Sequence, residues 1–156
     1  MKALLVFYSR TGTTKHVARV IHHFLKCDVE EVVDKKNRAG VLGYLRGGRD
    51  ALRKRPTKIN APVKDASKYD VVIVGTPVWA YKMTPAIRTY LFHNKDDFQN
   101  VAFFCTMGGS GASSTFKEMW KWCEKKPLAV MALKTKEVLS GDISGKVKDF
   151  LARLGK

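Results

Sequence analysis

Short runs of consecutive apolar residues, separated by longer amphipathic segments, set the strongest limit on how this chain can fold. The clearest runs lie at residues 3–8, 71–74, 101–105 and 128–133. Strands that helices cover on both faces have continuous apolar sequences of this kind. A further run at residues 29–33 is interrupted by Glu30 and Glu31, and we expect it nearer an edge. The pattern therefore predicts five strands of one sheet.

The segments between these runs have the spacing of amphipathic helices. Apolar residues recur at helical intervals at 17–25, 116–123 and 143–154, and Thr84-Pro85 is a favourable start for another helix. A weaker helix is expected at 41–54, because it contains Gly43, Gly47 and Gly48. Every connection is long enough for a crossover helix. The chain is thus predicted to be one α/β domain, residues 1–156, with an open parallel sheet in a three-layer arrangement.

Composition places the chain among globular proteins, with 45% hydrophobic and 28% charged residues. No apolar stretch approaches the roughly 20 residues of a membrane span, and the start of the sequence does not resemble a signal peptide. The three cysteines, Cys27, Cys105 and Cys123, form no CxxC pair. We therefore expect buried thiols in a reducing, cytoplasmic location rather than a disulfide framework or a zinc site.

The charge of the chain is strongly basic. Twenty-nine Lys and Arg against 14 Asp and Glu give a net charge of +15, which predicts an acidic partner, ligand or surface. Nine of these basic residues lie between Lys35 and Lys58, where Asp50 is the one acid and Tyr44 the one aromatic residue. Without a recognition motif, this segment does not predict specific binding of nucleic acid.

Three loops of unusual composition follow strands at the edge where open α/β sheets bind ligands. The first, residues 9–14, offers four hydroxyls, one glycine and the free amides of a helix start, which together suit a phosphate group. It matches neither the Walker motif nor GxGxxG, which disfavours a nucleoside triphosphate or a dinucleotide. The second, residues 75–83, carries Trp79 and Tyr81, and either could stack on a flat ring.

The third loop, residues 106–111, contains three glycines and so lets its backbone approach a ligand closely. A phosphate site, a stacking loop and a close-approach loop together predict a phosphorylated planar ring as the ligand. The sequence Ser9-Arg-Thr-Gly-Thr-Thr14 resembles the (S/T)-x-T-G-x-T phosphate signature of flavodoxins. Gly75-Thr-Pro-Val-Trp79 with Pro85, and the segment 106–111, are similar to the two flavin loops of short flavodoxins.

This resemblance implies a flavodoxin-like fold with strand order 2-1-3-4-5 and one non-covalently bound FMN. It assigns the phosphate to the first loop, with Arg10 pointing outward, and the flavin ring to the other two loops. The implied residues are Ser9, Arg10, Thr11, Gly12, Thr13, Thr14, Thr76, Pro77, Val78, Trp79, Ala80, Tyr81, Thr106, Met107, Gly108, Gly109, Ser110 and Gly111. The resemblance leaves open whether Trp79 or Tyr81 stacks on the ring. The basic charge departs from the family pattern, as does the lack of a tyrosine in the third loop.

The function implied is electron transfer through FMN, without catalytic side chains of the protein itself. An acidic redox partner is expected near Lys35, Lys36 and Arg38, because these residues follow a strand at the ligand-binding edge. The alternative is an FMN-dependent oxidoreductase of the same fold, acting on a quinone or a porphyrinogen. The four histidines, His16, His22, His23 and His93, lie in helical segments without metal-ligand spacing.

Overall fold

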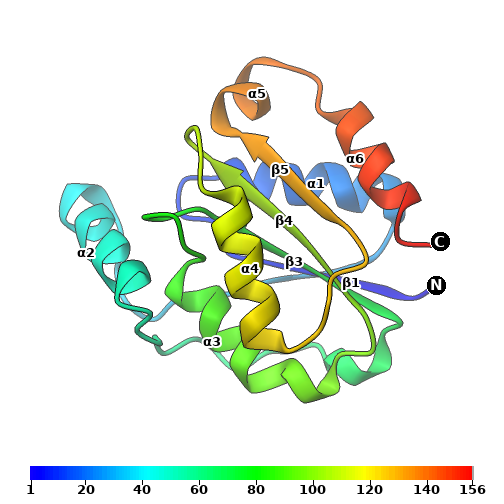
Figure 1. The fold of residues 1–156 in the computed structure, drawn as a ribbon, viewed down its shortest axis with the longest axis horizontal. Coiled ribbons are helices and arrows are strands. Elements are labelled where there is room, and N and C mark those ends of the chain that lie inside the picture. Colours follow the sequence, from blue (N-terminus) through cyan, green and yellow to red (C-terminus); the bar gives the residue numbers. More distant parts are fainter. Residues whose placement is uncertain (156) are drawn as a thin grey trace.

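A five-stranded parallel sheet lies between two layers of helices in the computed structural model, which describes residues 1–155 (Figure 1). The strand order is β2-β1-β3-β4-β5, so the predicted fold class and strand order are confirmed. The last residue of the predicted domain, 156, lies outside the described residues. The strands are β1 (Ala3–Phe7), β2 (Asp28–Glu31), β3 (Val71–Pro77), β4 (Val101–Met107) and β5 (Val130–Lys134).

Helices follow the strands as the apolar spacing predicts, with one addition. They are α1 (Thr13–Leu25), α2 (Gly40–Leu52), α3 (Pro85–Asn94), α4 (Ala112–Cys123), α5 (Thr135–Ser140) and α6 (Ser144–Ala152), with 3₁₀ turns η1 (Ala66–Lys68) and η2 (Lys95–Asp97). The sequence did not reveal α5, because this single short turn buries only Val138 and has no periodic stripe. Within residues 1–155, no helix is long and apolar enough to cross a membrane.

The strands build a core on each face of the sheet, because successive residues point to opposite sides. Leu4 and Val74 face the layer of α3 and α4, which lies in front of the sheet in Figure 1. Leu5 and Ile73 face the layer of α1 and α6. In β1, β3 and β4 the residues on both faces are buried, which explains why these strand sequences are continuously apolar.

Helix α2 stands at the carboxyl end of the sheet, beside these layers (Figure 1). It packs through glycines: a Cβ on Gly43 would lie 2.1 Å from the carbonyl carbon of Arg38, and one on Gly47 would lie 2.7 Å from the Trp79 ring. The glycines that lower the helix propensity of this segment are therefore the residues that let it approach the rest of the molecule. On its outer side, Val41 and Leu42 remain exposed.

A buried ion pair joins α2, α3 and α4. The Arg88 guanidinium, on α3, is fully buried and donates to Glu118 Oε1 of α4 at 2.9 Å and to the Ala51 carbonyl of α2 at 3.1 Å. Glu118 Oε2 accepts the backbone amide of Met83 at 3.1 Å. Burial lowers the pKa of Arg88 while Glu118 opposes this, and a guanidinium remains charged at any physiological pH. The carboxyl end of α2 thus accepts a hydrogen bond from a buried charge, the Arg88 guanidinium.

Removing either partner of this pair should destabilise the fold strongly, because the other would be left buried and unpaired. We expect Arg88→Met or Glu118→Gln to lower the free energy of unfolding by about 3–5 kcal/mol in urea denaturation. The double variant should lose less than the sum of the two, since no unpaired charge then remains. Strictly additive losses would contradict a direct coupling between the two side chains.

Candidate functional site

The three loops predicted to form the site meet at the carboxyl edge of the central strands. Strand pairing sets Phe7 beside Gly75 and Pro77 beside Thr106. The backbone continues this contact beyond the strands, because the amide of Val78 donates to the carbonyl of Thr106 at 2.8 Å. Helices α1 and α4 both start at this edge, so the amino ends of two helices face the same region.

The first loop presents backbone donors for an anion. Gly12 precedes α1 with φ of 98°, a left-handed conformation that glycine adopts without strain. The Ser9 hydroxyl accepts the amides of Gly12 at 3.1 Å and Lys15 at 3.2 Å, which fixes the turn. Among residues 1–155, the amides of Thr11 and Thr13 have no hydrogen-bond acceptor. The loop therefore offers free N–H groups at a helix start, as an oxyanion requires.

Several predicted residues brace the loops instead of facing solvent. Thr14 and Thr106 are buried and share a hydrogen bond of 2.7 Å between their hydroxyls, which ties the first loop to the third. Thr76 is also buried, and its hydroxyl accepts the amide of Thr84 at 3.1 Å. The other predicted residues of these loops, Trp79 apart, are exposed or half-buried at the edge.

Trp79 lies in the core under α2. Its ring packs edge-to-face on Tyr8, with centroids 5.6 Å apart, and against Gly47. The Arg38 guanidinium carbon lies 5.8 Å from the ring centroid. Only 8% of the surface of Trp79 is exposed, and its ring supports α2 by packing beneath it.

Tyr81 occupies the tip of the second loop and is 61% exposed. Reciprocal backbone hydrogen bonds of 2.9 Å between Trp79 and Lys82 close a tight turn, in which Ala80 and Tyr81 have φ of 48° and 63°. Left-handed conformations are unfavourable for non-glycine residues and cluster at functional sites. A Cβ on Gly111 would lie 3.1 Å from Cδ1 of Tyr81, so the tyrosine lies directly beside the third loop.

Arg38 does not lie on the surface where we expected an acidic partner to bind. Its side chain is buried, donating to Asp34 Oδ2 at 2.7 Å and to Asp50 Oδ2 at 3.1 Å. A buried, doubly paired guanidinium cannot contact a docking protein, so the expectation is wrong for this residue. Lys35 and Lys36 are exposed, as expected.

The arrangement suits a phosphorylated flat ring. Free amides at the start of α1 match an oxyanion, and the exposed Tyr81 beside the tight backbone at Gly111 matches a planar group. The three thiols are free and buried, and burial raises the pKa of Cys27 to about 11 and of Cys105 to about 12. The thiols are therefore neutral and inaccessible at neutral pH.

These features define an α/β protein whose carboxyl edge, where the strand order reverses, has the shape and donors that suit a phosphorylated planar ligand. The flavodoxin family model matches residues 2–151, and the chain belongs to this family. No curated protein matches the chain.

Solved structures share the fold. A flavoprotein from Lactobacillus acidophilus NCFM, solved in complex with FMN, is 24% identical with a TM-score of 0.75, covering 88% of this chain and 95% of its own. A putative flavoprotein from Bacteroides eggerthii DSM 20697 is 19% identical with a TM-score of 0.78, and the match covers 99% of this chain and 98% of that protein's chain. The two-electron reduced flavodoxin of Megasphaera elsdenii is 15% identical with a TM-score of 0.64, covering 98% and 99%.

Sequence reasoning missed the residues that support the site from inside the protein. Arg88, Glu118 and Asp50 read as ordinary surface charges in helices, and no spacing marks them as buried. The small-xxx-small spacing of Gly43 and Gly47 was the available signal, because it permits two backbones or a ring to approach closely.

Acid should weaken the anchoring of α2. Burial raises the pKa of Asp50, but Arg38 and Lys36 more than offset this, so its pKa is lower than in the unfolded chain. A carboxylate of this kind stabilises the fold above its unfolded pKa, and its contribution is lost as pH falls through the folded value. We expect the free energy of unfolding to fall below about pH 4, and less steeply in Asp50→Asn, whose stability is already reduced at pH 7.

Urea denaturation at a series of pH values measures this effect. Asp149→Asn is the matched control, because Asp149 is exposed and its carboxylate forms no ion pair within the described chain. An acid limb of equal slope in Asp50→Asn and in the unmodified protein would show that the Arg38–Asp50 contact is not linked to folding.

Proposed function

We propose that this protein binds one FMN at the carboxyl edge of its sheet and carries electrons between redox partners. The observation that carries the proposal is the pairing of free amide donors at the start of α1 with an exposed tyrosine at the same edge. Membership of the flavodoxin family supports FMN as the cofactor, as does the FMN held by the Lactobacillus flavoprotein. The buried, free thiols support a reducing, cytoplasmic location.

The first loop would hold the phosphate. The amides and hydroxyls of Thr11 and Thr13 would donate to its oxygens, and the positive end of the α1 dipole would favour its charge. The Ser9 hydroxyl keeps the turn in place through its two accepted amides, and the Thr14–Thr106 bond keeps the third loop beside it. In this proposal Thr14 positions the loops, while Thr11 and Thr13 contact the ligand.

Tyr81 would lie against the flavin ring. Of the two aromatic candidates, only Tyr81 presents its side chain at the surface, because Trp79 is used in packing α2. The backbone of residues 108–111, with Gly111 beside Tyr81, would contact the other part of the ring. The neutral thiols and the loop hydroxyls supply no acid, base or nucleophile suited to a covalent step.

The flavin of FMN accepts and donates electrons when bound, and the protein supplies binding, orientation and electrostatics. Lys82 follows Tyr81, and Lys35 and Lys36 are exposed on the loop after β2. These charges would favour the approach of an acidic redox partner, an interaction that weakens as salt rises. Ultraviolet-visible spectra of the purified protein, and release of FMN on denaturation, test the cofactor directly.

Loss of a hydroxyl in the first loop should weaken FMN binding more than riboflavin binding, because riboflavin lacks the phosphate. We expect Thr11→Val and Thr13→Val each to raise the Kd for FMN about tenfold to hundredfold, as for a lost hydrogen bond to a charged group. Flavin fluorescence titration measures both ligands. Ser67→Ala is the control, because Ser67 lies in η1, just before β3, at the opposite edge of the sheet. Equal losses for the two flavins would place the phosphate elsewhere.

Removal of the tyrosine ring should weaken both flavins alike. We expect Tyr81→Leu to raise the Kd of FMN and riboflavin by about threefold to tenfold, the usual worth of an aromatic contact, and Tyr81→Phe to retain binding. Trp79→Phe, in contrast, should lower the stability of the fold with little change in the flavin absorption bands. If the flavin absorption bands change in Trp79→Phe while Tyr81→Leu binds both flavins as tightly as the unmodified protein, the stacking residue is Trp79.

A further inference from the structure

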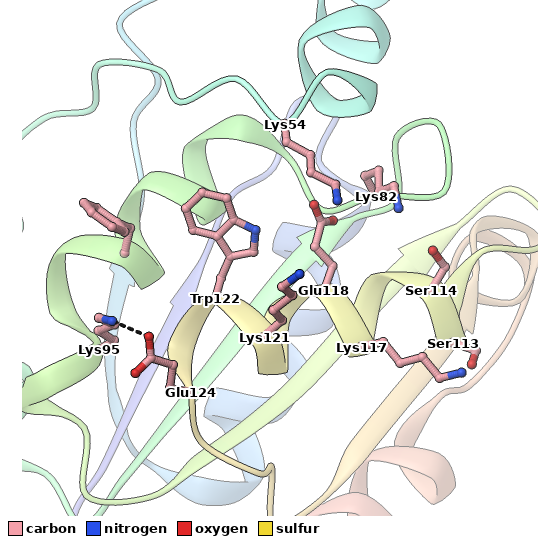
Figure 2. Close-up of a pocket in the computed structure, with 11 residues that line it drawn as sticks. Lys54, Lys82, Lys95, Ser113, Ser114, Lys117, Glu118, Lys121, Trp122 and Glu124 are labelled. Atoms are coloured by element: carbon pink, nitrogen blue, oxygen red, sulfur yellow. Dashed lines mark hydrogen bonds and ion pairs between the residues drawn. The ribbon is translucent and has the colours of Figure 1, made fainter.

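A groove of about 760 Å³ lies beside the candidate flavin site, and Lys82 is the residue of the predicted loops that lines it (Figure 2). Helix α4 forms its floor, the end of α3 forms one wall, and Lys82 and Lys54 border it from the loop after β3 and from the end of α2. Its volume lies within the usual range of small-molecule sites.

Positive charge dominates this groove. Lys54, Lys82, Lys117 and Lys121 line it, and none of them forms an ion pair with any residue of the described chain. In Figure 2 the side chains of Lys54 and Lys82 enter the groove on the side opposite α4, and Lys117 and Lys121 rise from α4 itself. Lysines four positions apart on one helix repel each other, so these side chains favour a negatively charged ligand.

The two carboxylates of the groove are already engaged. Glu118 Oε1 accepts from Arg88 at 2.9 Å, and its Oε2 accepts the amide of Met83 at 3.1 Å. Glu124 pairs with Lys95 at the far end of the groove (Figure 2). Neither acid pairs with the four lysines within residues 1–155, so the groove keeps an excess of positive charge.

An aromatic surface accompanies these charges. Trp122 is half-buried at the wall of the groove, supported by Phe92 with ring centroids 6.0 Å apart. Its indole N–H has no hydrogen-bond acceptor among residues 1–155, and Figure 2 shows this edge of the ring turned toward Glu118 and the lysines. A flat apolar surface with a free donor suits an aromatic ring that carries acceptor atoms.

We propose that this groove binds a small anionic molecule that combines an aromatic ring with several negative charges, as in a nucleoside polyphosphate or an aromatic polycarboxylate. The lysines would contact the charged groups and Trp122 the ring. Lys82 follows Tyr81 in the chain, so such a ligand would lie next to the proposed flavin. This site is formed by the groove's own residues and does not depend on FMN binding.

Calorimetric titration of the protein, kept saturated with FMN so that the phosphate loop is occupied, tests this site. The probes are ATP without metal, inorganic triphosphate and benzenehexacarboxylate, at an ionic strength of about 0.15 M, where weak surface attraction is largely screened. We expect ATP or benzenehexacarboxylate to bind at one site and to change tryptophan fluorescence. Tighter binding of one of the two assigns the charged groups to phosphate or to carboxylate.

Variants separate a built site from general attraction of anions. Lys117→Gln with Lys121→Gln should weaken binding at least about tenfold, since contacts to charged groups are lost. The matched control, Lys125→Gln with Lys126→Gln, removes the same charge just beyond α4 and should change little. Trp122→Leu should weaken the aromatic probes about threefold to tenfold and leave inorganic triphosphate unaffected. Thr13→Val, which weakens FMN, should retain binding in the groove.

Equal losses in the two lysine pairs would overturn the proposal, because the attraction would then reflect net charge alone. Inorganic triphosphate that binds as tightly as ATP, with no effect of Trp122→Leu, would overturn the aromatic part. Circular dichroism identifies a variant that does not fold; if Trp122→Leu does not fold, the pair Lys117 and Lys121, which is exposed, carries the test. Failure of FMN binding with an intact groove would refute the proposed function and leave this site standing.

Discussion

The buried ion pair between Arg88 and Glu118 holds together the parts of the molecule that surround the site. It connects α2, α3, α4 and the loop after β3 in one hydrogen-bonded unit, through the carbonyl of Ala51 and the amide of Met83. Desolvation offsets much of the Coulomb attraction within a buried ion pair. The pair therefore matters mainly because it fixes one arrangement of the elements around it. Here that arrangement holds the loop after β3 against α4, because Glu118 binds the amide of Met83.

The strained turn at the tip of that loop depends on this anchoring. Ala80 and Tyr81 both have left-handed backbones, a conformation that costs about 1–2 kcal/mol for each residue. The turn persists because its two ends are fixed: Trp79 is packed under Gly47, and the amide of Met83 is bound by Glu118. Packing on one side and a buried charge on the other thus keep Tyr81 at the surface, where a flat ligand can reach it.

The sequence was sufficient for the sheet and for the placement of the three loops, because apolar runs report burial directly and strand direction brings their carboxyl ends together. It was insufficient for α2. Helix propensity counts Gly43 and Gly47 as weaknesses, whereas the fold uses them as points of close approach. Net charge likewise counts Arg38 as basic surface, although Asp34 and Asp50 neutralise it inside the protein. Which charges are paired is a property of tertiary contacts that residue order does not record.

The same distinction explains why so much positive charge remains outside. Glu118 has two carboxylate oxygens, and the internal structure uses both, one for Arg88 and one for the Met83 amide. Lys54 and Lys82, which line the same groove, form no ion pair with any of residues 1–155. Because Glu118 is paired inside the protein, its charge does not balance the lysines of the groove. The positive charge of the groove is therefore a consequence of how Arg88 and Glu118 join α2 to α4. An anion bound there would complete, from solution, the neutralisation that the protein's own acids cannot provide.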